Sequence, residues 1–91
     1  MAVTIRIPTQ LRQLTGGTGE LNVEATTVAS ALAGLERAHQ GFAERIFDAD
    51  GQLRRFVNVF LADEDIRFLQ GLDTPVADGQ VISIVPAVAG G

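Results

Sequence analysis

The 91-residue chain contains no cysteine and only one histidine, His39. Without cysteine it offers no disulfide, no thiolate nucleophile, no iron–sulfur ligands and no cysteine zinc site. One histidine is too few for a histidine-based metal site or a catalytic dyad. No nucleophile–base pair is visible elsewhere, so we expect that the protein is not an enzyme and holds no metal.

Lysine is absent as well, so all seven basic residues are arginines, and the formal net charge is −4. A net negative protein repels the phosphate backbone, which argues against nucleic-acid binding. A chain without lysine also cannot be linked to further copies of itself through ε-amino groups. A compositional bias towards arginine explains the missing lysines equally well.

Long apolar runs are missing too. None approaches the roughly 18 residues that a membrane span requires. The first six residues alternate like a strand and lack the basic region and apolar stretch of a secretory signal. The expected location is therefore the cytoplasm, without a membrane partner. The length suits one domain, which we expect to be monomeric.

Apolar residues recur with two different periods along the chain. Alternation predicts strands at 3–7 and 20–24, and apolar runs predict strands at 56–61, where both faces are mostly apolar, and at 81–85. A short edge segment is expected at 66–68. A stripe of apolar residues at i, i+4 and i+7 predicts a helix at about 28–39, capped by Thr26 or Thr27. Gly34 should weaken this helix by about 1 kcal/mol unless a close backbone contact requires it. A shorter helical turn is expected at 42–47.

This order of elements predicts an α+β fold of the ubiquitin-like β-grasp type. One main helix lies across a mixed sheet of four or five strands, and the last strand returns beside the first. The expected core residues come from all of these elements: Val3, Ile5, Ile7, Leu21, Val23, Val28, Leu32, Leu35, Val57, Val59, Ile82 and Ile84.

Phe56, Asn58 and Phe60 alternate onto the strand face opposite Val57 and Val59. If this face is open, its apolar surface is a candidate docking site for partner proteins. Alternatively, a loop or a second helical turn covers it, because the sequence does not show which face is buried.

Three consecutive acidic residues, 63–65, lack the spacing of a calcium loop and are expected to form a solvated turn. Arg54, Arg55 and Arg67 either pair with these acids or face a partner.

The sequence ends with Pro86, Ala87, Val88, Ala89, Gly90 and Gly91. Together with the runs at 11–16, 55–60 and 63–68, this tail resembles the ThiS/MoaD family of prokaryotic sulfur carriers. The likeness is greatest to the branch that serves cysteine biosynthesis. It covers essentially the whole chain and implies a β-grasp domain at 1–85 followed by a flexible tail at 86–91.

The resemblance implies that Gly91 carries the sulfur. An E1-like adenylyltransferase would activate the Gly91 carboxylate with ATP, and a sulfurtransferase would convert it to a thiocarboxylate. A pyridoxal-phosphate-dependent cysteine synthase would use the sulfur, and a zinc metalloprotease would release the cysteine. These cofactors belong to the partners, so the chain itself is expected to hold none.

Two other functions remain open at this point. The chain could be a ubiquitin-like modifier that forms isopeptide bonds with lysines of other proteins. It could also be the small subunit of a synthase of the molybdopterin or thiamine type.

Overall fold

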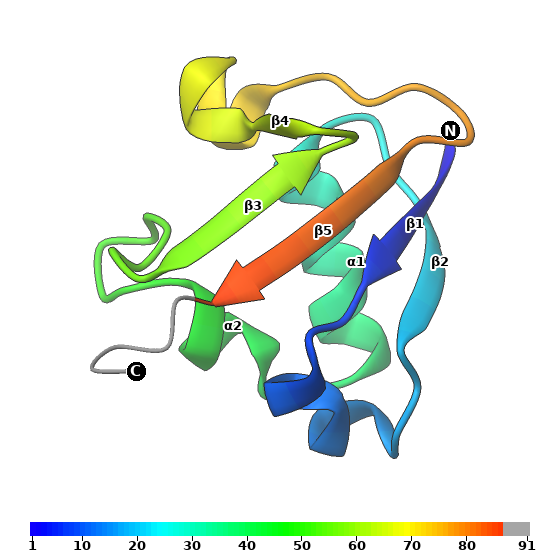
Figure 1. The fold of residues 1–91 in the computed structure, drawn as a ribbon, viewed down its shortest axis with the longest axis vertical. Coiled ribbons are helices and arrows are strands. Elements are labelled where there is room, and N and C mark those ends of the chain that lie inside the picture. Colours follow the sequence, from blue (N-terminus) through cyan, green and yellow to red (C-terminus); the bar gives the residue numbers. More distant parts are fainter. Residues whose placement is uncertain (87–91) are drawn as a thin grey trace.

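The framework of the chain is a mixed sheet of five strands (Figure 1). The computed structural model describes residues 1–86, and the expected tail residues 87–91 lie outside the described residues. The strands are β1 (Ala2–Arg6), β2 (Glu20–Glu24), β3 (Val57–Leu61), β4 (Glu64–Asp65) and β5 (Val81–Pro86). They lie in the order β2-β1-β5-β3-β4, with β5 parallel to β1 and all other neighbours antiparallel. The predicted β-grasp arrangement is confirmed.

The helix α1 (Val28–Ala38) covers one face of this sheet (Figure 1). Thr27 caps its first turn: the Thr27 side chain accepts a hydrogen bond from the Ser30 backbone N–H, and the Ser30 hydroxyl accepts one from the Thr27 N–H. Such a reciprocal cap satisfies two backbone donors at the start of a helix. The face turned to the sheet is apolar and buried, and consists of Val28, Ala31, Leu32 and Leu35.

The shorter helical elements close the ends of the sheet. They are the 3-10 helix η1 (Thr9–Thr15), the helix α2 (Phe42–Ile46) and the 3-10 helices η2 (Ile66–Phe68) and η3 (Gly71–Asp73). Phe42 and Ile46 of α2 are each only 1% exposed, so this helix belongs to the core.

Ten of the twelve predicted core residues are buried. The other two, Leu21 and Val23, are partly buried and pack against the core from outside. Both lie on β2, which is an edge strand of the sheet. An edge strand has a neighbour on one side only, so its inward side chains are less completely enclosed.

The segment 66–68 is not the edge strand that was predicted. Its residues form η2, while β4 immediately before it takes the edge position. The Asp65 carboxylate accepts a hydrogen bond from the Arg67 backbone N–H at 2.8 Å, which turns the chain into the 3-10 helix. Aspartate favours such local bonds to the backbone two residues on. A second, smaller difference is that β5 runs one residue further than expected, to Pro86.

We predict that Gly34→Ala stabilises the protein. A Cβ at Gly34 would lie 3.5 Å from Val23 Cβ, an ordinary van der Waals distance. The gain in helix propensity should raise the free energy of unfolding by about 0.5–1 kcal/mol, measured by urea denaturation.

Gly41→Ala is the matched control. Gly41 has φ 110°, and a Cβ there would lie 3.1 Å from Leu14 Cδ2, so the same substitution should destabilise. Destabilisation by Gly34→Ala would instead mean that α1 and β2 cannot accommodate the extra methyl group.

Candidate functional site

The end of β5 is the point from which residue 87 continues the chain. The strand β5 pairs with β1 over residues 81–83 and with β3 over residues 82–86, and Pro86 itself lies opposite Val57. Proline lacks a backbone donor and is tolerated at the end of a strand. The origin of the tail is therefore held by β3, at the end of the central strand of the sheet (Figure 1).

Beside this exit, one face of the sheet is open. Val57 and Val59 are 6% and 0% exposed and point towards α1, whereas Phe56 is 54% exposed. Asn58 and Phe60 of β3, partly exposed, alternate onto the face opposite Val57 and Val59, and Phe56 lies in the turn immediately before β3. The structure thus answers the question that the sequence left open: Asn58 and Phe60 lie on the uncovered face, and the exposed Phe56 adjoins it at the start of β3.

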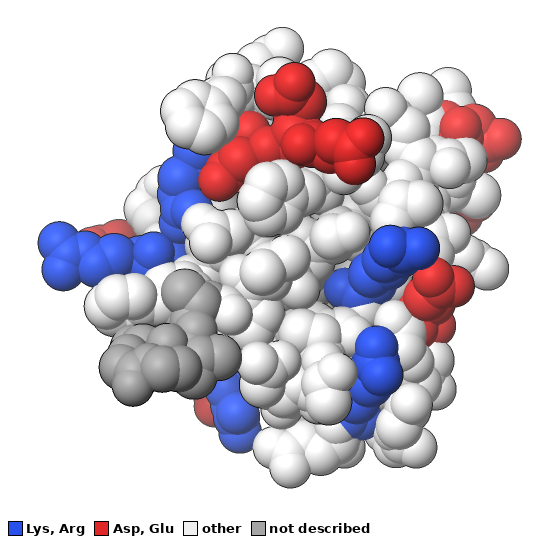
Figure 2. Space-filling model, viewed as in Figure 1, with Lys and Arg blue, Asp and Glu red and all other residues white. Residues whose placement is uncertain are grey.

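The strand register extends this face across β5. Asn58 lies opposite Val85, which is 44% exposed, and Phe60 lies opposite Ser83. Figure 2 shows an uncharged surface across the middle of this side of the molecule, with acidic residues along one edge. We call the surface formed by Phe56, Asn58, Phe60, Ser83 and Val85 the open face.

Arg67 fastens η2 to the beginning of β3. Its guanidinium donates hydrogen bonds to Asn58 Oδ1 at 2.8 Å, to the Val57 carbonyl at 2.9 Å and to the Arg54 carbonyl at 3.1 Å. Asn58 is therefore held in place within the chain, and Arg67 satisfies backbone groups instead of pairing with the neighbouring acids.

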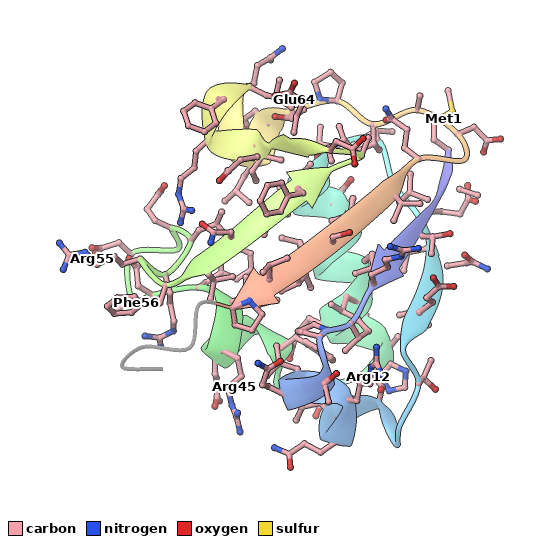
Figure 3. All side chains as sticks on the ribbon, in the orientation of Figure 1. Met1, Arg12, Arg45, Arg55, Phe56 and Glu64 are labelled. Atoms are coloured by element: carbon pink, nitrogen blue, oxygen red, sulfur yellow. The ribbon has the colours of Figure 1, made fainter. Side chains whose placement is uncertain are left out.

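A pocket opens directly beside Pro86. Basic residues from two separate segments, α2 and the loop before β3, meet there, and Figure 3 shows Arg45, Arg55 and Phe56 flanking the end of β5. The sequence singled out Arg54 and Arg55 but missed Arg45, because no local pattern links α2 to that loop. The full lining is Arg45, Asp48, Arg54, Arg55, Phe56, Val57 and Pro86.

Glu36, at the end of α1, holds α2 in position. Its two carboxylate oxygens accept hydrogen bonds from the backbone N–H groups of Ala43 at 2.8 Å and of Gly41 at 3.2 Å. These bonds, that of Ala43 first, favour the ionised form and hold the pKa of Glu36 below its ordinary value. The helix that carries Arg45 is thus tied to the main helix through one carboxylate.

Other kinds of site find no support among residues 1–86. This part of the chain contains no group of three or more acidic or histidine side chains placed to hold a metal ion. None of its helices is long and apolar enough to cross a membrane. The acidic segment 63–65 lies in the turn after β3 and in β4, and it is largely exposed.

Comparison with known proteins relates this geometry to a family. A model of the ThiS family matches residues 5–91. The chain belongs to the ThiS family. The match spans both the body of the fold and the segment beyond Pro86.

Three relatives of this ThiS family chain are informative. It is 45% identical to the sulfur carrier protein CysO of Mycobacterium tuberculosis, over the full length of both chains. The crystal structure of the Amycolatopsis orientalis BexX/CysO complex contains a chain that superposes with a TM-score of 0.91 at 43% identity, covering 98% of this chain and 99% of that one. Small archaeal modifier protein 3 of Haloferax volcanii is 37% identical over 71% of this chain and 70% of its own length.

We predict that Glu36→Gln destabilises the protein most at neutral pH. Because the pKa of Glu36 is lowered in the folded state, its stabilising effect is fully present above the ordinary value of 4.5. The effect is lost as the pH falls through the lower, folded-state pKa. The difference in unfolding free energy between wild type and Glu36→Gln should therefore shrink on acidification.

Urea denaturation over a series from about pH 7 to about pH 3 measures this difference. Glu44→Gln is the matched control, because the exposed Glu44 side chain accepts no hydrogen bond from described residues. A Glu36→Gln effect that stays constant across the series would contradict the assignment.

Proposed function

We propose that this protein is a sulfur carrier that delivers sulfur from a thiocarboxylate at Gly91, for cysteine biosynthesis. The observation that carries the proposal is the 45% identity to sulfur carrier protein CysO along the whole of both chains. In this proposal the protein is a substrate for other enzymes and performs no catalysis itself.

The Gly91 carboxylate is a poor electrophile, so it must first be activated. An oxygen of the Gly91 carboxylate attacks the α-phosphorus of ATP on an E1-like adenylyltransferase, which gives an acyl-adenylate and releases pyrophosphate. A sulfur donor delivered by a sulfurtransferase then displaces AMP and leaves the thiocarboxylate. ATP is a cytoplasmic reactant, so we place this cycle in the cytoplasm.

The later partners follow from the cysteine branch. A pyridoxal-phosphate-dependent cysteine synthase accepts the sulfur, and a zinc metalloprotease releases cysteine from the carrier. The cofactors of both reactions belong to these enzymes.

In this proposal the described body, residues 1–86, docks on the partner and residues 87–91 react. Residues 87–91 have a reach of at most about 17 Å at roughly 3.3–3.6 Å per extended residue. That length is enough to enter a partner's active site while the body stays outside. Docking the body raises the effective concentration of the tail in that site. We propose the open face, with Phe56, Asn58 and Phe60, as the docking surface.

A second candidate function is that of a ubiquitin-like modifier. The similarity to small archaeal modifier protein 3 favours it. Mass spectrometry of the protein from its native cells separates the two functions. Replacement of one oxygen by sulfur at Gly91 supports the carrier, whereas a branched peptide joining Gly91 to lysines of other proteins supports the modifier.

We predict that deleting Gly91, or extending the chain beyond it, abolishes sulfur loading and leaves the fold intact. The buried core lies between Val3 and Ile84, so the body keeps its packing. Loading is read by intact-protein mass spectrometry after incubation with adenylyltransferase, ATP and sulfur donor, and folding by the thermal midpoint. Full loading of an extended and unprocessed chain would rule out the carrier mechanism.

We predict that Phe60→Glu and Phe56→Glu each slow loading by about thirtyfold or more, because truncation of aromatic anchors at interfaces costs roughly 2 kcal/mol or more. Phe56→Glu should disturb the fold less than Phe60→Glu, because the Phe56 side chain is more exposed and contributes less packing. Ala33→Glu, on the exposed side of α1, adds the same charge behind the sheet and should load normally. Normal loading of Phe56→Glu in a folded protein would show that partners dock elsewhere.

A further inference from the structure

Three of the seven arginines line the pocket beside Pro86, where the tail begins. Arg45 comes from α2, and Arg54 and Arg55 come from the loop before β3. Together with Phe56 and Pro86 they line a pocket of about 520 Å³. The tail thus leaves the body beside a local excess of positive charge, although the chain as a whole has a net charge of −4.

Contacts within residues 1–86 do not neutralise this charge. The ion pairs formed in this part of the chain join Arg6 to Glu20 and the N-terminus to Glu24, at the far side of the sheet. In the pocket, Arg54 donates a hydrogen bond from Nε to the Glu44 carbonyl at 3.0 Å. The side chains of Arg45 and Arg55 are exposed and donate no hydrogen bond to any described residue.

The one acidic residue in the pocket lining, Asp48, already accepts hydrogen bonds from the neighbouring turn. Asp48 Oδ1 accepts hydrogen bonds from the backbone N–H groups of Asp50 at 2.9 Å and of Gln52 at 3.1 Å. The pocket lining therefore contains three arginines and one aspartate, and the carboxylate of that aspartate stabilises its own loop. The lining thus carries a net positive charge, which favours the binding of an anion.

The chemistry of the lining indicates which anion. Guanidinium groups bind carboxylates through paired, charge-assisted hydrogen bonds. Arginine beside an exposed aromatic ring is typical of the energetically important residues in protein interfaces. The pocket also adjoins the open face, since Phe56 belongs to both. A protein surface bearing acidic side chains fits these features.

We propose that Arg45, Arg54 and Arg55 form a docking site for carboxylate side chains of the enzyme that adenylates the tail. This inference rests on the proposed function. Any enzyme that takes up residues 87–91 must come close to Pro86, and adenylation is the first such reaction. The arginines guide the encounter and orient the body, while the apolar open face supplies contact area.

The test measures ATP–pyrophosphate exchange by the adenylyltransferase of the same organism with Arg45→Glu and Arg55→Glu. Arg54 is left unchanged, because it also holds the Glu44 carbonyl. Each substitution should raise the KM for the carrier by about tenfold at low salt and leave kcat unchanged, as expected for a loss of electrostatic complementarity. The difference from wild type should shrink as salt is added.

Arg37→Glu is the matched control. Arg37 is exposed on α1, behind the sheet, and its substitution changes the net charge by the same amount. A rise in KM equal to that of Arg55→Glu would overturn the proposal, because net charge alone would then be responsible. Wild-type KM values in Arg45→Glu and Arg55→Glu would overturn it as well.

The outcome also separates this inference from the function on which it rests. Wild-type protein that supports no exchange at all would refute the carrier function and the docking site with it. Wild-type exchange that the arginine variants match in KM would refute only the docking site.

Discussion

The pairing of β5 with β1 and β3 is the constraint on which the rest of the structure depends. Ile82 and Ile84, 0% and 3% exposed, fix its inner side in the core, and backbone ladders fix both edges. Pro86 lies at the end of this strand and pairs with Val57, so it cannot shift without breaking its contact with β3. The tail origin, the open face and the arginine pocket all take their positions from this strand.

The two faces of the sheet consequently differ in burial: one is packed against α1 and the other is partly exposed. The inner face meets α1 and supplies stability, since it buries the alternating aliphatic residues of β1, β3 and β5. The outer face keeps an exposed ring at Phe56 and an exposed Val85 beside Asn58. Arg67 holds the Asn58 side chain and the backbone before it, so this end of β3 is ordered without being covered. A partner would meet a preformed surface, which reduces the entropy lost on binding.

Local periodicity was enough to predict most of the fold. Alternation at 3–7 and the helical stripe at 28–35 each follow from contacts that repeat along one element. The prediction was wrong at 66–68, where a side-chain bond from Asp65 overrides strand propensity. The open face could not be assigned, because both sides of 56–61 are apolar in sequence. Arg45 was missed since its proximity to Arg55 depends on how Glu36 fixes α2, and tertiary contacts of that kind leave no local pattern.

Charged and apolar groups near Pro86 would affect different rates in the binding of a partner. Charged groups at the rim of an interface mainly accelerate association, whereas buried apolar contacts mainly slow dissociation. The pocket offers exposed arginines, while the open face offers few exposed large apolar side chains, chiefly Phe56 and Val85. Such a surface favours fast association with a partner and a short-lived complex. The proposed carrier function, in which the protein leaves an activating enzyme before it meets the next partner, requires both.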